Sequence, residues 1–166
     1  MIYLIGLLLF GILAIIQSTI VSSTPLLLGT ADLLLLFIVA WALQDRVDSS
    51  WSWCLIGGIF ASLYSALPFG AFIVAYLICV SITRLIKHRI WKAPFLAMLA
   101  AIFISTVVSQ SIAFLSRVML GVSLPLPDVF NLILLPSLLL NLILAIPVFS
   151  IMRDFARWLY PEELEV

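Results

Sequence analysis

Charged residues are absent from most of this chain, and this feature constrains its fold more than any other. The stretch 49–83 holds 35 residues without Asp, Glu, Lys or Arg, and 1–31, 93–116 and 129–152 are uncharged too. A membrane-spanning helix needs about 20 apolar residues to cross roughly 30 Å of hydrocarbon. With 65% hydrophobic residues and only 10% charged ones, the chain has more apolar surface than a soluble domain of its size can bury. The sequence therefore predicts an all-α integral membrane protein with one polytopic membrane domain over 1–166.

Turn-forming residues divide the apolar sequence into six segments. The cluster 22–25 ends the first segment and the polar run 44–50 ends the second. Pro68 and Gly70 predict a turn that cuts the long uncharged stretch in two. Pro94 suits the first position of a helix, where its missing N–H has no partner to lose. We expect a bundle of six transmembrane helices at approximately 2–21, 26–43, 50–67, 69–83, 94–116 and 129–152.

The distribution of basic residues predicts the orientation of these spans. The segment 84–92 carries four of the eight Lys and Arg residues, and basic loops lie predominantly on the cytoplasmic side. In a six-span protein, the 44–50 loop and both termini share that side, which adds Arg46, Arg153 and Arg157. Only Arg117 then lies outside. We expect both termini in the cytoplasm.

No group of side chains in the sequence is suited to catalysis. His88 is the single histidine and lies among cations, which disfavours a metal. Neither paired carboxylates within a span nor a Gly-rich phosphate loop occurs. Cys54 and Cys79 lie apart in apolar runs, as small buried hydrophobic side chains do. We expect no enzymatic activity, no cofactor and no metal, and the zero net charge indicates no nucleic-acid partner.

The polar residues within the spans fall in the outer half of the membrane. We expect an outer-leaflet polar cluster of Gln17, Asp32, Gln110 and Asn131. It could serve interhelical hydrogen bonding that holds the bundle together, or it could line a small outward-facing cavity for a ligand or a partner helix. For Asp32 a structural role is also open, with Thr30 as the N-cap and Asp32 in the first helical turn.

Small residues recur every four positions on two of the predicted spans, a pattern that permits close helix packing in membranes. Such stripes mark contacts within one chain or contacts with a partner helix, and both readings are open here. As partner-packing positions we predict Ala14, Ser18 and Ser22 on the first span and Gly57, Gly58, Ala61 and Ser62 on the third.

Three stretches of the sequence resemble the rod shape-determining MreD family. The Leu-rich stretch 30–46 resembles the second span of that family, and 57–78 resembles its Gly-rich span with the following Pro-x-Gly turn. The stretch 138–159, with an internal Asn, a Pro and a basic end, resembles its closing span. The likeness extends over nearly the whole chain in span order and length.

This resemblance implies a noncatalytic scaffold of the bacterial cell-elongation complex, located in the bacterial inner membrane. The implied partners are a single-span MreC-type protein, the peptidoglycan polymerase–transpeptidase pair and, indirectly, the MreB cytoskeleton. The implied fold is similar to the six-helix substrate-binding subunit of energy-coupling-factor transporters. A vitamin-binding subunit of such a transporter is accordingly the alternative function, because it is also a short six-span chain that depends on membrane partners.

Overall fold

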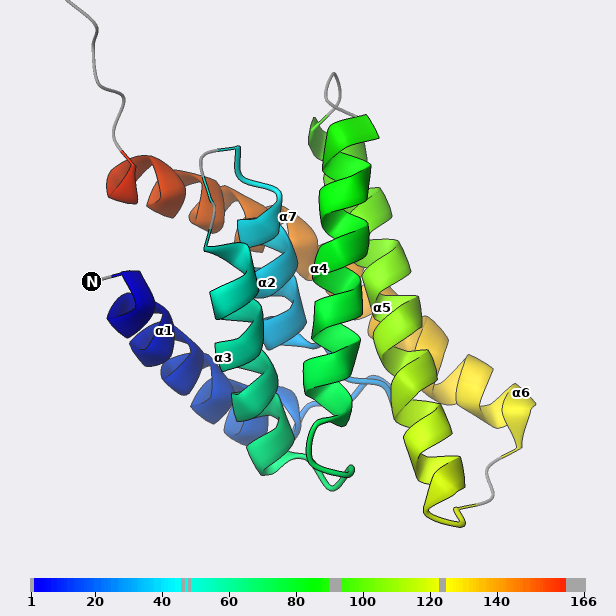
Figure 1. The fold of residues 1–166 in the computed structure, drawn as a ribbon. Coiled ribbons are helices and arrows are strands. Elements are labelled where there is room, and N and C mark those ends of the chain that lie inside the picture. The colour runs from blue at the N-terminus through cyan, green and yellow to red at the C-terminus, as the bar shows by residue number, and fades with distance from the viewer. Residues whose placement is uncertain (1, 46, 48, 90–93, 123–124, 161–166) are drawn as a thin grey trace, which may run out of the picture.

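The computed structural model describes residues 2–45, 47, 49–89, 94–122 and 125–160, and within these ranges the chain contains helices and no strand. Its long helices pack side by side (Figure 1). In chain order the elements are α1 Ile2–Ile16, the π-helix η1 Gln17–Val21, α2 Leu33–Ala42, α3 Ser50–Tyr64, α4 Ala71–Arg89, α5 Pro94–Met119, the short α6 Leu126–Asp128, the π-helix η2 Val129–Leu134, and α7 Leu135–Leu159.

Among the described residues, four helical segments are long and apolar enough to cross a membrane. They are Tyr3–Val21, Ala71–Arg89, Pro94–Met119 and Leu126–Leu159. The helices at the second and third predicted spans are shorter: α2 has 10 residues and α3 has 15. At 1.5 Å per residue these lengths correspond to about 15 Å and 22 Å. The chain therefore has the character of a multi-pass membrane protein.

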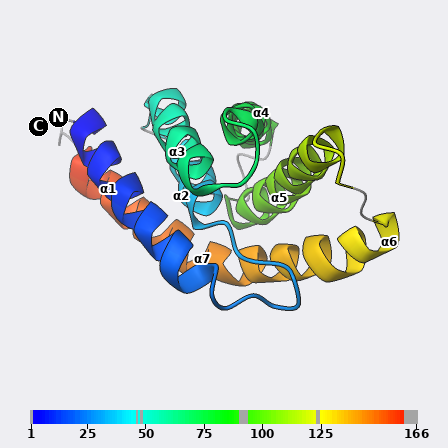
Figure 2. The ribbon, with the colours of Figure 1, turned by 90° about the horizontal axis from the view of Figure 1, so that it is seen from below.

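The shortest of the main helices, α2, occupies the centre of the fold. It packs against α3, α4, α5 and α7, and eight of its ten residues are buried. Figure 2 shows the curved segment from α6 to α7 running along one side of the molecule. Because α2 is covered by protein on all sides, it depends little on lipid contact.

An aromatic cluster joins α2 to α3 and α7 near one end of the bundle. The rings of Trp41 and Trp53 stack with centroids 4.1 Å apart, and Phe155 lies 5.8 Å from Trp41. Phe10 of α1 meets Trp53 edge to face at 5.8 Å. Such ring pairs contribute about 0.5–1.5 kcal/mol each beyond the area they bury, so they hold this end of four helices together.

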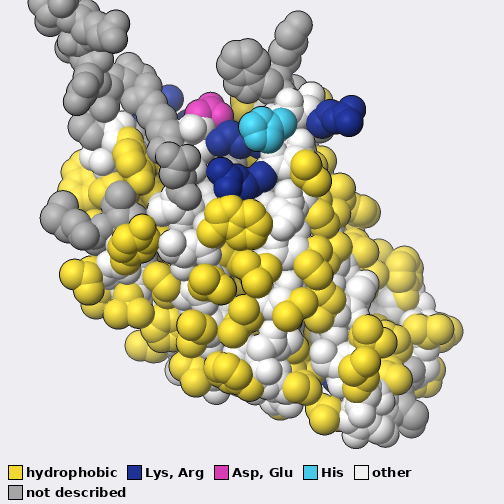
Figure 3. Space-filling model, viewed as in Figure 1, with side chains coloured by type: hydrophobic (Ala, Val, Ile, Leu, Met, Phe, Trp, Pro, Cys, Tyr) yellow, Lys and Arg dark blue, Asp and Glu magenta, His cyan; other side chains and the backbone are white. Residues whose placement is uncertain are grey.

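Basic side chains gather at the end of the molecule where α4 ends (Figure 3). The guanidinium of Arg84 in α4 lies 5.9 Å from the ring centre of Trp51 in α3. The Nζ atom of Lys87 donates to the Gln44 carbonyl at 2.6 Å and lies 3.5 Å from Asp45. The basic segment expected as a loop is thus helical as far as Arg89. Arg46 and Lys92, which contribute to the predicted orientation, lie outside the described residues.

The second predicted span is wrong in its first seven residues. We expected a helix over 26–43, but α2 begins at Leu33, and residues 22–32 form an irregular connecting segment. Leu26 and Gly29 pair through their backbones at 2.9 Å in both directions, and Leu27 adopts a left-handed conformation with φ +57°. The backbone groups that bond in these turns are not available to a helix. This stretch is therefore irregular, although most of its residues are apolar.

The remaining boundaries differ by a few residues at helix ends. The third helix ends at Tyr64, while the last segment begins at Leu126 and continues to Leu159. Between α3 and α4, the Pro68 carbonyl accepts from the Ala71 amide at 3.1 Å. Gly70 has φ +98° there, a conformation that glycine adopts without steric cost.

The small residues of α3 face helices of this same chain, which corrects their prediction as partner-packing positions. A Cβ on Gly57 would lie 2.6 Å from Ile38 Cδ1 in α2, and one on Gly58 would lie 2.9 Å from the Cα of Ile73 in α4. Ala61 and Ser62 are also buried. The missing side chains let α2 and α4 approach α3, and no room remains on this face for a partner helix.

We expect Gly58→Ala to destabilise the fold by about 1–3 kcal/mol through overpacking, because the added Cβ meets the backbone of α4. The matched control is Gly11→Ala, whose Cβ would meet Phe60 at an ordinary 3.6 Å. This control should be neutral or gain up to about 1 kcal/mol of helix propensity. Denaturant titration of the purified protein in detergent measures both, and equal stability of the two variants would contradict the packing described.

Candidate functional site: a buried polar network around Asp32

The connecting segment 22–32 lies against the π-helix η2 and the start of α7. The Leu28 amide donates to the Leu132 carbonyl at 3.0 Å. Leu132 lies in η2, four positions before Pro136, which has no N–H to donate to it. The connecting segment thus hydrogen-bonds to the backbone of the last long helical segment.

Gly29 makes the close approach of this segment possible. A Cβ at this position would lie 2.6 Å from the Ile133 carbonyl oxygen and 2.7 Å from the Ser137 nitrogen. Any side chain would push the connecting segment away from α7. Next to it, the Thr30 amide donates to Ser137 Oγ at 3.1 Å, so the contact is both close and hydrogen-bonded.

Gln17 binds the backbone on either side of Asp32. Its Nε2 atom donates to the Ala31 carbonyl at 2.8 Å, and its Oε1 atom accepts from the Leu33 amide at 2.9 Å. The side chain is buried and lies in the π-helix η1 at the end of α1. One amide side chain thus satisfies both a carbonyl that precedes α2 and an N–H of its first turn, which would otherwise be costly to bury.

Asn141 connects the same backbone to α5. Its Oδ1 atom accepts from the Asp32 amide at 2.8 Å, and its Nδ2 atom donates to Thr106 Oγ1 at 3.0 Å. Asn141 and Thr106 are both buried. The connecting segment is therefore held by side chains from η1 and α7, and Asn141 in turn binds Thr106 of α5.

Asp32 itself is the N-cap of α2. Its Oδ1 atom accepts from the Leu35 amide at 3.0 Å, and the Tyr76 hydroxyl lies 2.8 Å and 2.9 Å from the two carboxyl oxygens. The expectation that Thr30 caps the helix, with Asp32 in the first turn, is wrong in register, because the helix begins only at Leu33. The capping bond belongs to Asp32.

The carboxyl group of Asp32 also lines a cavity of about 140 Å³. Of the predicted polar cluster, Gln17, Asp32 and Gln110 line it together. The other polar residues around it come from the connecting segment, α3 and α5: Ser22, Thr30, Tyr64, Ser109 and Arg117. This arrangement offers a carboxylate, a guanidinium, two amides and several hydroxyls to a small polar group.

Asn131 does not belong to this cluster, which corrects its prediction. Its side chain is exposed on η2 and is not among the residues that line the cavity. Asn141, ten positions later, is the inward-facing amide instead. A lone Asn in the apolar run 138–149 was the available signal for it, whereas the tyrosine at position 76 carried no signal that distinguished it from other aromatic residues in the spans.

A second surface feature, the α1–α3 groove, shares Tyr64 with the polar cavity. It has a volume of about 350 Å³ and is lined by Gly11, Ala14 and Ile15 of α1, Ser18 of η1, and Phe60, Leu63 and Tyr64 of α3. Ala14 and Ser18, predicted as partner-packing positions, thus lie together at an open apolar groove. Ser22 lies at the polar cavity instead, and its hydroxyl donates to the Gln17 carbonyl at 2.8 Å.

Comparison with protein-family models, with curated proteins and with solved structures found no match to this chain.

We expect Asn141→Leu to destabilise the protein by about 1–3 kcal/mol, because the Asp32 amide and the Thr106 hydroxyl would lose their buried partner. The matched control, Asn131→Leu, changes an exposed amide and should have an effect below about 0.5 kcal/mol. Thermal unfolding of both variants in the same detergent measures the difference. A stable Asn141→Leu variant would show that the network does not hold the connecting segment.

Proposed function

We propose that this chain is a noncatalytic membrane scaffold of the bacterial cell-elongation complex, in which it holds the transmembrane helix of an MreC-type partner. The proposal rests on the resemblance of 30–46, 57–78 and 138–159 to the MreD family. It rests equally on the α1–α3 groove, against which the partner helix would pack.

The α1–α3 groove is the single structural observation that carries the proposal. Lipid tails are as apolar as leucine side chains, so helices associate in membranes through close van der Waals packing, for which small residues are favourable. Such a surface is formed along α1 and η1 by Gly11, Ala14 and Ser18. The equivalent stripe on α3 faces α2 and α4. One small-residue stripe is therefore available to a partner, and the other is used within the fold.

The proposed scaffold crosses the inner membrane six times with both termini in the cytoplasm. This is supported by the basic residues of α4, which gather at one end (Figure 3), and by Arg117 near the far end of α5. The start of α1 and the end of α7 lie near each other in both ribbon views (Figures 1 and 2). In this arrangement α2 and α3 cross only with the help of connecting segments.

Through the MreC-type partner, the scaffold would associate with the peptidoglycan polymerase–transpeptidase pair outside the membrane and indirectly with MreB filaments inside. The alternative, a vitamin-binding subunit, is less well supported. Its pocket would be the polar cavity of about 140 Å³, whereas pockets for such molecules usually have about 300–1,000 Å³.

Capture of the partner helix tests this proposal. We expect the tagged chain, purified from native membranes in mild detergent, to retain an MreC-type single-span protein. Ala14→Leu and Ser18→Leu should each reduce the retained amount by at least about tenfold, because a bulky side chain in the groove keeps the helices apart. Quantitative mass spectrometry of the purified samples gives the ratio.

Thr19→Leu is the matched control, since Thr19 is an exposed neighbour on the same helical segment and is not among the residues that line the groove. It should leave capture unchanged, and all three variants should keep the unfolding midpoint of the original chain. Retention of a stoichiometric vitamin without a single-span partner would overturn the proposal in favour of the transporter subunit. If all three variants captured the partner equally, the partner helix would not bind in the α1–α3 groove, and this part of the proposal would be wrong.

A further inference from the structure

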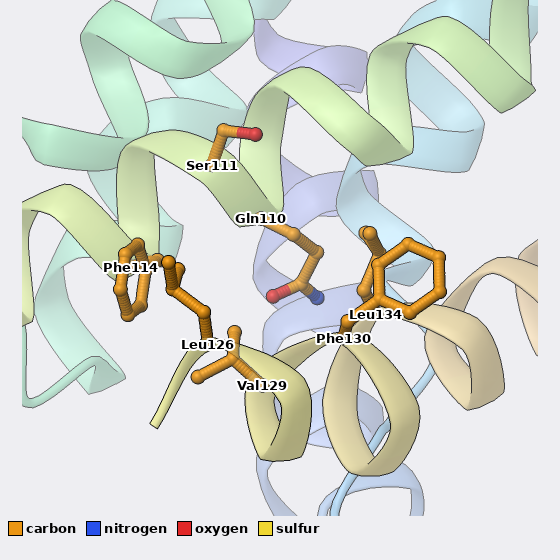
Figure 4. A pocket seen from close by; sticks show the side chains of 7 residues that line it. All are labelled: Gln110, Ser111, Phe114, Leu126, Val129, Phe130 and Leu134. Atoms are coloured by element: carbon orange, nitrogen blue, oxygen red, sulfur yellow. The ribbon is translucent and has the colours of Figure 1, made fainter. Parts of the chain in front are cut away.

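Two hollows meet at Gln110 of α5. One is the polar cavity beside Asp32, and the other is an apolar groove of about 280 Å³ between α5 and the α6–η2 segment. Figure 4 shows the Gln110 side chain reaching into the space between α5 and η2, with Phe114 and Val129 on one side and Phe130 on the other. A molecule with a polar end and an apolar end would fit the two hollows together.

Arg117 provides a cation at the polar end. Among the described residues its guanidinium has neither an ion pair nor a hydrogen bond to another side chain, although it lines the cavity. It is the 24th residue of α5, so it lies about 35 Å from Pro94 along the helix axis. That distance exceeds the hydrocarbon thickness of about 30 Å and places Arg117 at the level of lipid headgroups.

Asp32 provides an acidic side chain in the same cavity. Its two carboxyl oxygens have about four acceptor sites, and the described donors to them are the Leu35 amide and the Tyr76 hydroxyl. The carboxylate can therefore accept further hydrogen bonds from the cavity. A guanidinium and a carboxylate that line one small cavity complement a group with both a negative and a positive charge.

We propose that the polar cavity and the α5–η2 groove bind one zwitterionic aminophospholipid. Its phosphate pairs with Arg117 through charge-assisted hydrogen bonds, a role for which the planar guanidinium is well suited. Its primary ammonium, with three N–H donors, reaches Asp32, and an acyl chain lies in the groove between Phe114 and Phe130. The groove favours a lipid over a free headgroup, because a soluble ligand would leave these apolar side chains without an occupant.

Lipid titration followed by native mass spectrometry tests this proposal on the purified chain. The probes are phosphatidylethanolamine, phosphatidylcholine and phosphatidylglycerol with identical acyl chains. We expect one phosphatidylethanolamine to be retained at least about tenfold better than either other lipid, since the choline headgroup has no N–H donor and the glycerol headgroup has no cation. Equal retention of all three lipids would overturn the proposal, as would phosphatidylglycerol binding as well as phosphatidylethanolamine.

Variants separate the two ends of the site. Arg117→Gln should lower phosphatidylethanolamine retention by at least about tenfold, whereas Arg157→Gln, an exposed arginine on α7, should have no effect. Asp32→Asn keeps an acceptor for the Leu35 amide and should abolish the preference for ethanolamine over choline. An unchanged Arg117→Gln variant would contradict the assignment of the phosphate site.

The groove is tested with Val129→Trp, which fills it without touching the polar cavity. This variant should lower binding of the lipid but not of glycerophosphoethanolamine, the headgroup without acyl chains. If the original chain binds glycerophosphoethanolamine as tightly as the lipid, the occupant is a soluble molecule and the proposal is wrong. The outcome is independent of partner capture, because Arg117, Val129 and the α5–η2 groove take no part in the α1–α3 groove.

Discussion

Backbone N–H and C=O groups at membrane depth must find partners within the protein, because lipid offers none. In this fold the requirement falls on residues 22–32, which are irregular although they lie beside Leu126–Leu159, a segment long and apolar enough to cross a membrane. Helices satisfy their own backbone, but the connecting segment relies on Gln17, Ser137 and Asn141 and on the Leu132 carbonyl. The positions of α1, α5 and α7 around α2 follow from these bonds.

The same constraint explains why polar and apolar hollows occur side by side. Because α2 is short and begins at Leu33, with Asp32 as its N-cap, a polar cavity opens where a full-length helix would have filled the space. Asp32 is kept there by its capping bond and by Tyr76, while the neighbouring helices α5 and η2 remain far enough apart to leave an apolar groove. The α1–α3 groove is separate from the polar cavity and shares only Tyr64 with the residues that line it. The two proposed interactions therefore use different sets of side chains.

The sequence predicts the order of the helices well and their packing less well. Uncharged runs and the Pro and Gly residues of the turns place the helical segments, and the polarity of Gln17, Asp32 and Gln110 indicates that they cluster. The start of α2 could not be predicted, because 26–36 is rich in leucine and its irregular shape depends on Leu132, Ser137 and Asn141, more than 100 positions away. The direction of Gly57 and Gly58 was equally hidden, since a small-residue stripe looks the same whether it meets its own chain or a partner.

Hydrogen–deuterium exchange in lipid nanodiscs tests most directly whether side chains of neighbouring helices hold the connecting segment. The account predicts that the amides of Leu28, Thr30, Asp32 and Leu33 exchange at least about tenfold more slowly than those of Phe69 and Gly70 in the α3–α4 turn, because local protection follows local hydrogen bonding. Asn141→Leu should accelerate exchange at Asp32, while Asn131→Leu should not. Exchange of the connecting segment as fast as that of the α3–α4 turn, or indifference of Asp32 to the loss of Asn141, would contradict it.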